Sequence, residues 1–328
     1  IRLCASIVSI IGVVAIMACA EKMDSTLIAI VFLQSFVFIF DIYEVLSWWY
    51  TVRLESKYTE IACIIATVLC AIWRITLLAI NASVVWFAAN SSITSLVSLL
   101  ILVVMFRKHE EHPALLFRKH RAIQLIKNGY HYILISFATV IFSSCDKVML
   151  KYYFTEQEVG IYTAAVTIAC MWEFIPNALI TSSSQIVYSK ANNKKEFEYE
   201  IKILSCVISF ISVIVCFVML VFGKLAIRLL YGEAYLNAYI PLVILTFSTG
   251  FSMLGNVRGQ WIIVHNAQRY GKYYMIMSGL ANIILNAILI PKLGLIGAAI
   301  ATLCSQLFLT FISPLFFSAT REYVGIYL

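Results

Sequence analysis

The sequence has little charge. Only 12% of its 328 residues are Asp, Glu, Lys or Arg, whereas 62% are hydrophobic. A soluble domain carries about 25% charged residues, so this chain cannot cover a water-exposed surface in the usual way. Ten helical spans of about 20 residues would use most of its apolar positions. The composition therefore predicts an all-α, polytopic membrane protein and excludes a soluble enzyme, a secreted disulfide scaffold and a disordered chain.

Several motifs of catalysis and cofactor binding are also missing. The nine cysteines contain no C-x-x-C pair, and we interpret them as small hydrophobic residues between helices. Gly223-Lys224 is followed by Leu225, so it is not an ATP-binding phosphate loop. We find no H-E-x-x-H motif and no Ser/His/Asp arrangement. The sequence therefore predicts no cofactor, no metal site and no ATP-driven step.

Long hydrophobic segments are abundant. The first, 3–20, lacks a basic region and a cleavage site, so we interpret it as a membrane span and not as a signal peptide. The second is short and is predicted to continue as a helix past Asp41 and Glu44 toward Trp48. Hydropathy predicts ten spans, at 3–20, 26–40, 61–80, 84–106, 123–145, 159–188, 203–222, 240–264, 273–290 and 295–317.

The basic residues are unevenly distributed between the loops. Of the 24 Lys and Arg residues, six fall in one set of alternate loops, three lie in spans or at their ends, and fifteen fall in the other set. The set of fifteen is Arg2, Arg53, Lys57, Arg107, Lys108, Arg118, Lys119, Arg121, Lys190, Lys194, Lys195, Lys202, Arg269, Lys272 and Arg321. This asymmetry predicts a multi-pass membrane protein whose two chain ends both face the cytoplasm.

The longest polar connection, 107–121, carries five basic residues and three histidines. We interpret it as a cytoplasmic linker near anionic lipid headgroups, and it separates four spans from six. Transporters are often built from repeats of equal helix number. We therefore expect residues 1–122 to be a truncated N-terminal lobe with its linker, residues 123–328 to be a C-terminal lobe, and the full protein to have twelve spans.

Charged groups inside spans are costly and are the first candidates for function. Glu173 lies about 14 residues from either end of its predicted span, and Pro176 predicts a kink beside it. Glu173 is interpreted either as a cavity residue that carries a proton or as a protonated group bonded to a neighbouring helix. Arg74 and Arg258 lie near span ends. Each either reaches the membrane surface or lines a cavity and holds an anionic group.

The remaining polar candidates have simpler explanations. Asp41 and Glu44 share one face of a helix near its cytoplasmic end, where a solvated terminus or a cavity would account for them. Asp146 and Lys147 end their predicted span and are interpreted as an interfacial ion pair. Asn282 and Asn286 are four residues apart on one helix, which favours hydrogen bonds between packed helices over a cavity role.

Four stretches of sequence then point to a family. They are the run from Asn282 through Pro291 and Gly297 to Thr302, Asp146 to Leu150 followed by Val159 to Tyr162, Trp172 to Pro176 with Ser182 to Ser184, and Tyr231 to Tyr235. In this order they resemble the signatures of Wzx-type oligosaccharide flippases of the MOP superfamily. The chain departs from the family at Cys170, where an acidic residue is common, and at Ser184-Gln185, where a proline is common.

The resemblance implies a MATE-like bundle of two helical lobes around a central cavity. It also implies a substrate, an oligosaccharide repeat unit on undecaprenyl pyrophosphate, that is moved across the bacterial inner membrane for O-antigen, capsule or exopolysaccharide synthesis. We expect H⁺ or Na⁺ coupling, contact with membrane lipids, and a polysaccharide polymerase and a chain-length regulator as partners, with no nucleic acid. The alternatives are a MATE-type cation antiporter and, from another class, a membrane-embedded polymerase or acyltransferase.

Overall fold

The structure is a computed structural model that describes residues 2–19, 25–53, 57–109 and 118–317, together with residues 55, 320, 321 and 323. The described residues form helices and turns and contain no strand. The chain divides into two compact units, Ile1–Ile123 and Gln124–Leu328, which we call unit 1 and unit 2. The division falls one residue after the boundary that the sequence predicts.

Unit 1 is built on three long helical stretches and α1. The first of these stretches, Ile28–Thr51, includes α2, α3 and α4 and confirms that the second predicted span continues past Asp41. Its helices are α1 (Arg2–Cys19), α2 (Ser25–Ser35), α3 (Val37–Phe40), α4 (Tyr43–Val52), α5 (Lys57–Ala79), α6 (Val84–Ala88) and α7 (Asn90–His109).

Serine hydroxyls join the helices of unit 1 directly. Ser92 on α7 donates to the carbonyl of Leu33 on α2 at 2.5 Å. The buried hydrophobic cluster of this unit is small and consists of Tyr50, Ala62 and Leu102. Hydrogen bonds from a serine hydroxyl to a backbone carbonyl often join apolar helices, because a small polar residue allows the two helix backbones to approach closely.

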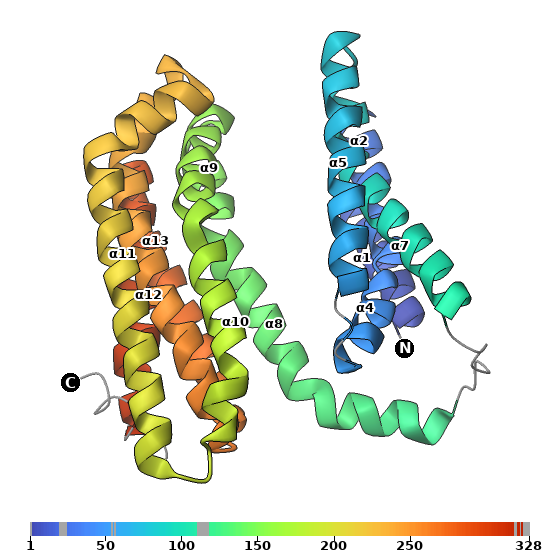
Figure 1. The fold of residues 1–328 in the computed structure, drawn as a ribbon. Coiled ribbons are helices and arrows are strands. Elements are labelled where there is room, and N and C mark those ends of the chain that lie inside the picture. The colour runs from blue at the N-terminus through green and yellow to red at the C-terminus, as the bar shows by residue number, and fades with distance from the viewer. Residues whose placement is uncertain are drawn as a thin grey trace. The chain divides into compact units, whose positions relative to one another are not determined.

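Unit 2 contains the longer helices, seen in Figure 1 from green to red. It begins within α8 (Lys119–Tyr153) and ends in short turns of other helix types. Its other elements are α9 (Glu156–Cys170), a 3₁₀ turn (Met171–Glu173), α10 (Phe174–Ser189), α11 (Lys194–Tyr231), a 3₁₀ turn (Glu233–Ala238), α12 (Tyr239–Val264), α13 (Gln268–Leu307), a π-helix (Phe308–Ile312) and a 3₁₀ turn (Ser313–Phe316).

The last long helix folds back on itself at a glycine. Gly294 has φ 55° and ψ −131°, which a residue with a side chain rarely adopts. Ser278 donates to the carbonyl of Ser305 at 2.8 Å, although 27 residues of straight helix would hold these residues about 40 Å apart. A Cβ atom on Gly297 would overlap the carbonyl oxygen of Leu289. α13 therefore consists of two antiparallel arms, which match the predicted spans 273–290 and 295–317.

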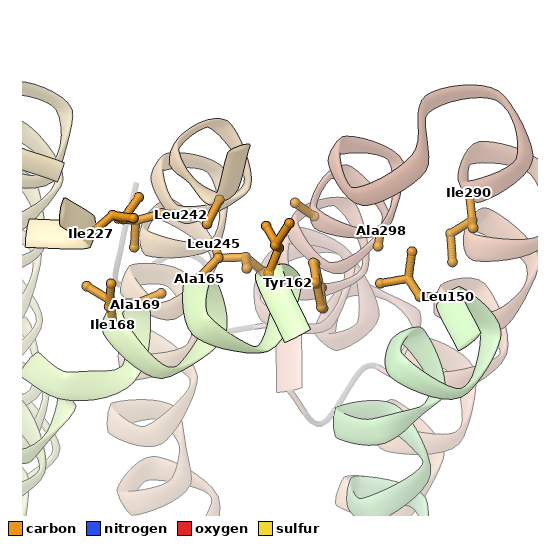
Figure 2. Close-up of a cluster of buried hydrophobic side chains, with 13 residues drawn as sticks. Leu150, Tyr162, Ala165, Ile168, Ala169, Ile227, Leu242, Leu245, Ile290 and Ala298 are labelled. Atoms are coloured by element: carbon orange, nitrogen blue, oxygen red, sulfur yellow. The ribbon is translucent and has the colours of Figure 1, made fainter. Parts of the chain in front are cut away.

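Two buried hydrophobic clusters hold unit 2 together. One, shown in Figure 2, joins α8, α9, α11, α12 and both arms of α13 through residues such as Leu150, Ile168, Leu242 and Ala298. The other surrounds Trp172, Phe197 and Trp261. Each cluster has thirteen buried residues. The first cluster includes five alanines, and such small residues let membrane helices approach closely.

Among the described residues, eight helical stretches are long and apolar enough to cross a membrane, and Ala5–Ala15 is a shorter apolar helix. The longest stretch, Tyr270–Phe316, has 47 residues, or about 70 Å of helix rise, against about 30 Å of hydrocarbon. Since it folds back at Gly294, it provides two crossings. The prediction of an all-α polytopic membrane protein is confirmed.

Candidate functional site

Unit 2 encloses a cavity of about 550 Å³ between α8, α9, α12 and α13. Two acidic side chains, Asp146 and Glu173, and one basic side chain, Arg258, lie in its wall among serines, threonines and amides. The lining residues are Thr139, Phe142, Ser143, Asp146, Val166, Ala169, Cys170, Glu173, Leu245, Ser248, Thr249, Ser252, Gly255, Asn256, Arg258, Met275, Thr302, Gln306 and Leu309. A polar cavity in an apolar lobe is the arrangement expected of a transport site.

Asp146 is the first of the ionisable groups, and its interpretation as an interfacial ion pair is wrong. α8 continues seven residues beyond it to Tyr153, so Asp146 is an internal residue of the helix. Its side chain is only 5% exposed. One carboxylate oxygen accepts a hydrogen bond from the hydroxyl of Tyr162 on α9 at 2.6 Å, and the other accepts from the backbone N–H of Lys147 at 2.8 Å. The carboxylate is therefore fixed between two helices.

Glu173 lies at the break between α9 and α10. The predicted kink is confirmed: the 3₁₀ turn Met171–Glu173 comes immediately before α10, in which Pro176 is the third residue. Proline removes a backbone N–H and its ring displaces the carbonyl four residues earlier, which belongs to Trp172. The break brings the half-buried side chain of Glu173 to the cavity wall.

The neighbouring Trp172 fastens this break to α12. Its indole Nε1 donates to the hydroxyl of Thr249 at 3.1 Å. The single hydrogen of that hydroxyl lies between two carbonyl acceptors, that of Thr246 in its own helix at 2.9 Å and that of Ala169 on α9 at 3.3 Å. The hydroxyl of Thr249 thus contacts both sides of the break, where the regular backbone hydrogen bonds of the helix are interrupted. The position of Glu173 is set by a hydrogen-bonded joint and not by helix geometry alone.

Arg258 is buried and bonds to backbone, so it does not extend to the membrane surface. Its guanidinium donates to the carbonyl of Leu309 at 2.5 Å and to that of Thr310 at 3.2 Å. Both carbonyls belong to the π-helix Phe308–Ile312, where widened turns interrupt the normal hydrogen-bond pattern. The guanidinium also lies over the ring of Tyr274, with 5.4 Å from its central carbon to the ring centroid.

The cavity wall beside Arg258 is polar, and Gly255 lies against its polar atoms. A Cβ atom at Gly255 would lie 3.9 Å from Nη2 of Arg258, 3.9 Å from Nε2 of Gln306 and 3.7 Å from the hydroxyl of Thr310. Gln306 donates to the hydroxyl of Thr310 at 3.4 Å. This corner combines a cation with amide and hydroxyl groups, which suits an anionic group that accepts several hydrogen bonds.

The other predicted residues of unit 2 lie outside this cavity. Asn282 and Asn286 have no exposed surface, and the amide of Asn286 donates to the carbonyl oxygen of Asn282 at 2.9 Å. Both partners of this bond lie on the first arm of α13, and the amide nitrogen of Asn282 and the side-chain oxygen of Asn286 are buried without a hydrogen-bond partner. The predicted hydrogen bonds between packed helices are therefore not found at these two residues.

Three predicted residues belong to unit 1. Arg74 is exposed on α5 and its Nε donates to the side-chain oxygen of Asn90 at 3.0 Å. Asp41 accepts from the hydroxyl of Ser95 at 2.8 Å. Glu44 forms an ion pair with Arg2 at 2.7 Å. Each has a partner within its own unit, and a cavity role for these three residues stays a prediction.

Sequence reasoning missed Asp146 as a cavity residue and missed the partners of Arg258. The contact between Asp146 and Tyr162 could have been predicted from the sequence. The two residues belong to one motif and lie on consecutive helices on either side of a single turn. The π-helix Phe308–Ile312 could not have been predicted in this way, because its sequence resembles that of an ordinary apolar α-helix.

Comparison with known proteins gives two matches. A family model described as polysaccharide biosynthesis protein matches residues 2–240. The chain is also similar to a structure of the lipid II flippase MurJ in an inward closed conformation, with a TM-score of 0.57 and 17% sequence identity. That match covers 91% of this chain and 62% of the other, so the chain spans less than two thirds of that structure's length. No curated protein matches the chain.

Proposed function

The chain belongs to the polysaccharide biosynthesis protein family, and on this premise we propose that it moves a lipid-linked oligosaccharide across a bacterial inner membrane. The substrate proposed is a repeat unit on undecaprenyl pyrophosphate, used for O-antigen, capsule or exopolysaccharide synthesis. The role is transport and not catalysis. A polysaccharide polymerase and a chain-length regulator are the proposed partners, and both ends of this chain are proposed to face the cytoplasm.

The observation that carries this proposal is the polar cavity of unit 2 with Asp146, Glu173 and Arg258 in its wall. A sugar head cannot enter hydrocarbon without losing hydrogen bonds to water, each worth several kcal/mol. Amides and hydroxyls in the wall replace those bonds, and Arg258 supplies positive charge for a pyrophosphate. The similar fold of a lipid II flippase supports a lipid-linked substrate.

Coupling to an ion gradient is assigned to the two carboxyl groups. Asp146 and Glu173 lie on different helices, α8 and the break after α9, and both line the cavity. A carboxylate inside an apolar lobe is stabilised by a bound proton or cation. Binding of H⁺ or Na⁺ to Asp146 or Glu173 therefore makes the cavity less negative and favours binding of a pyrophosphate. Binding of the ion and of the anionic head is therefore coupled in this proposal.

The test is deletion of the gene in its native host. We expect lipid-linked repeat units to accumulate on the cytoplasmic face of the inner membrane and surface polysaccharide to be lost. The native gene restores both, whereas the Asp146→Ala/Glu173→Ala double variant, matched for expression, does not. Unchanged surface polysaccharide after deletion would refute the proposed function.

Access of water to the cavity is tested by thiol labelling. In a variant whose native cysteines are replaced, a single cysteine at Glu173→Cys should react with an aqueous maleimide in membranes. The matched control retains only Cys216, which is 6% exposed and lies outside this cavity, and it should stay unlabelled. Protection of the cysteine at position 173 under all conditions would show that Glu173 is sealed among helices.

A cation antiporter is the second candidate, because two of the three ionisable groups in the cavity are carboxyl groups. Organic cations are attracted to such groups, and a proton or Na⁺ would exchange for them. Cells that express the protein would then expel ethidium, and the double carboxylate variant would not. Ethidium efflux together with normal surface polysaccharide in the deletion strain would favour this function over the flippase.

A further inference from the structure

A second hollow lies on the outside of unit 2, along the seam where α11 packs against α12. It has a volume of about 400 Å³ and is lined by Ser209, Ser212, Val213, Cys216, Phe217, Leu220, Phe247, Gly250, Phe251 and Leu254. Figure 1 shows α11 and α12 side by side over most of their length. We call this hollow the seam groove. None of its lining residues lines the polar cavity.

Small residues form the floor of the seam groove and large ones form its walls. Ser212, Cys216 and Gly250 are buried, whereas Phe217 is 66% exposed and Phe247 is 41% exposed. The hydroxyl of Ser212 donates to the carbonyl of Ile208 in its own helix at 2.7 Å, so the floor needs no polar ligand. The groove is therefore shaped for a flexible apolar chain.

A more polar hollow of about 460 Å³ lies farther along α11. It is lined by Lys224, Leu236, Asn237, Tyr239 and Ile240 from the same two helices and the turn between them, and by Glu158 on α9 and Leu293, Gly294, Leu295 and Ile296 at the reversal of α13. Leu220 lines the groove and Lys224 follows it by one helical turn, about 6 Å. At the junction the hydroxyl of Tyr239 donates to the carbonyl of Leu220 at 2.7 Å. The two hollows are consecutive along one seam.

Lys224 gives the polar hollow a positive charge. Its Nζ lies over the ring of Tyr239, 5.1 Å from the centroid. Within the described part of the chain no carboxylate lies in ion-pair distance of Lys224, whereas nearby Arg228 is paired with Glu233 at 2.7 Å. Glu158 also lines the hollow, but its carboxylate accepts a hydrogen bond from the backbone N–H of Thr155 at 3.3 Å as part of a helix cap.

We propose that the seam between α11 and α12 binds one anionic glycerophospholipid, with an acyl chain in the seam groove and its phosphate at Lys224. An apolar groove beside Tyr239 and Lys224, a cation with no described carboxylate in ion-pair distance, is complementary to an acyl chain that ends in an anion. The site is separate from the transport cavity, so it holds a lipid of the surrounding bilayer and not the transported substrate.

The test is native mass spectrometry of the purified protein, released from micelles that contain equal amounts of phosphatidylglycerol and phosphatidylethanolamine. We expect retention of one phosphatidylglycerol in preference to phosphatidylethanolamine, by about fivefold for one lysine near the membrane surface. Lys224→Gln should abolish the preference. Lys151→Gln is the matched control, because Lys151 is also exposed but is paired with Glu156 at 2.7 Å.

The acyl part of the site is tested by filling the groove. Cys216→Leu should lower retention of both lipids, whereas Cys206→Leu, an exposed position of the same helix outside the groove, should not. Equal retention of phosphatidylglycerol by the native protein and by Lys224→Gln would overturn the headgroup assignment. Displacement of phosphatidylglycerol by undecaprenyl phosphate at equal concentration would overturn the choice of occupant in favour of the substrate's own tail.

Discussion

Charged side chains are treated differently in the two units. In unit 2, Asp146 and Arg258 are 5% and 7% exposed, and each bonds to a different element of the fold. In unit 1, Arg74 is exposed, and Glu44 forms an ion pair whose two side chains keep 29% and 39% of their surface. Unit 2 thus buries two of its charged groups, whereas the charged groups compared in unit 1 stay at least partly exposed.

The size of the hydrophobic clusters explains this difference. Unit 2 has two clusters of thirteen buried residues, whereas the described cluster of unit 1 has three. A buried charge is tolerated only if rigid neighbours keep its hydrogen-bond partners in place. The lobe with the larger core can therefore fix ionisable groups in a cavity, and this is the lobe in which we expect substitutions to have the larger effects.

The largest effect is expected at the fold of α13. Gly297→Ala should lower the free energy of unfolding by about 3 kcal/mol or more, because the new methyl group overlaps the backbone of Leu289, which cannot rotate away. In unit 1, Gly12→Ala meets nothing within 4 Å and should be neutral. Thermal unfolding of the purified proteins in detergent measures both. Equal stability of the two variants would show that the arms of α13 separate readily.

A smaller loss is expected when the buried guanidinium is removed. Arg258→Ala removes the guanidinium's hydrogen bonds to the carbonyls of Leu309 and Thr310 in the π-helix, although Ser313 still donates to that of Leu309, and the loss costs about 2 kcal/mol. Arg74→Ala in unit 1 removes one exposed hydrogen bond to Asn90 and should change stability by less than about 0.5 kcal/mol. The same unfolding measurement applies. A similar loss in both variants would break the contrast between the units.

Transport should distinguish the carboxyl groups of the two units. Glu173→Gln should lower the rate of repeat-unit transfer about tenfold, equal to about 1.4 kcal/mol, because the cavity loses a group that binds the coupling ion. Glu44→Gln removes the ion pair with Arg2 and should retain most of the rate. Export of labelled repeat units in the complemented deletion strain is the readout. A tenfold loss in Glu44→Gln as well would assign transport function to unit 1.

The smallest changes in stability are expected when a single hydroxyl group that donates to a carboxylate is removed, once in each unit. Tyr162→Phe removes the 2.6 Å bond to Asp146 and should destabilise the protein by about 1 kcal/mol. Ser95→Ala removes the 2.8 Å bond to Asp41 and should cost about half as much, because Asp41 is only partly buried. The difference between the two unfolding temperatures is the measurement, and an equal shift would show that burial adds nothing.

Much of the architecture was predictable. Hydropathy located most of the spans, although the span predicted at 123–145 lies at Ile133–Tyr153 and the one predicted at 3–20 is only a shorter apolar helix, Ala5–Ala15. The Gly294 reversal lies between two predicted spans because a membrane helix cannot run 47 residues through one bilayer. Pro176 predicted the break that places Glu173. The motifs around Asp146 and Asn282 predicted the family, and a polysaccharide biosynthesis model that matches residues 2–240 confirms that resemblance.

The candidate site was predictable only in part. Glu173 and Arg258 were singled out because charge is rare in spans, and both line the cavity of unit 2. Asp146 was placed at the end of its span because hydropathy falls there, although α8 continues as a helix to Tyr153. Hydropathy measures transfer into lipid. It cannot show that a carboxylate near the end of an apolar segment finds its donor on the next helix.

The sequence by itself determined that this chain spans a membrane, where its helices lie and to which family it belongs. These properties follow from composition and local motifs, since each transmembrane helix satisfies its own backbone hydrogen bonds. Only the tertiary structure decided which charged residues share a cavity, that Arg258 bonds to a π-helix, and that the α11–α12 seam is hollow. These features depend on packing between residues that are distant in sequence. One hydrogen bond from Arg258 to Leu309, or a small residue such as Gly250 in the seam, influences how the helices pack.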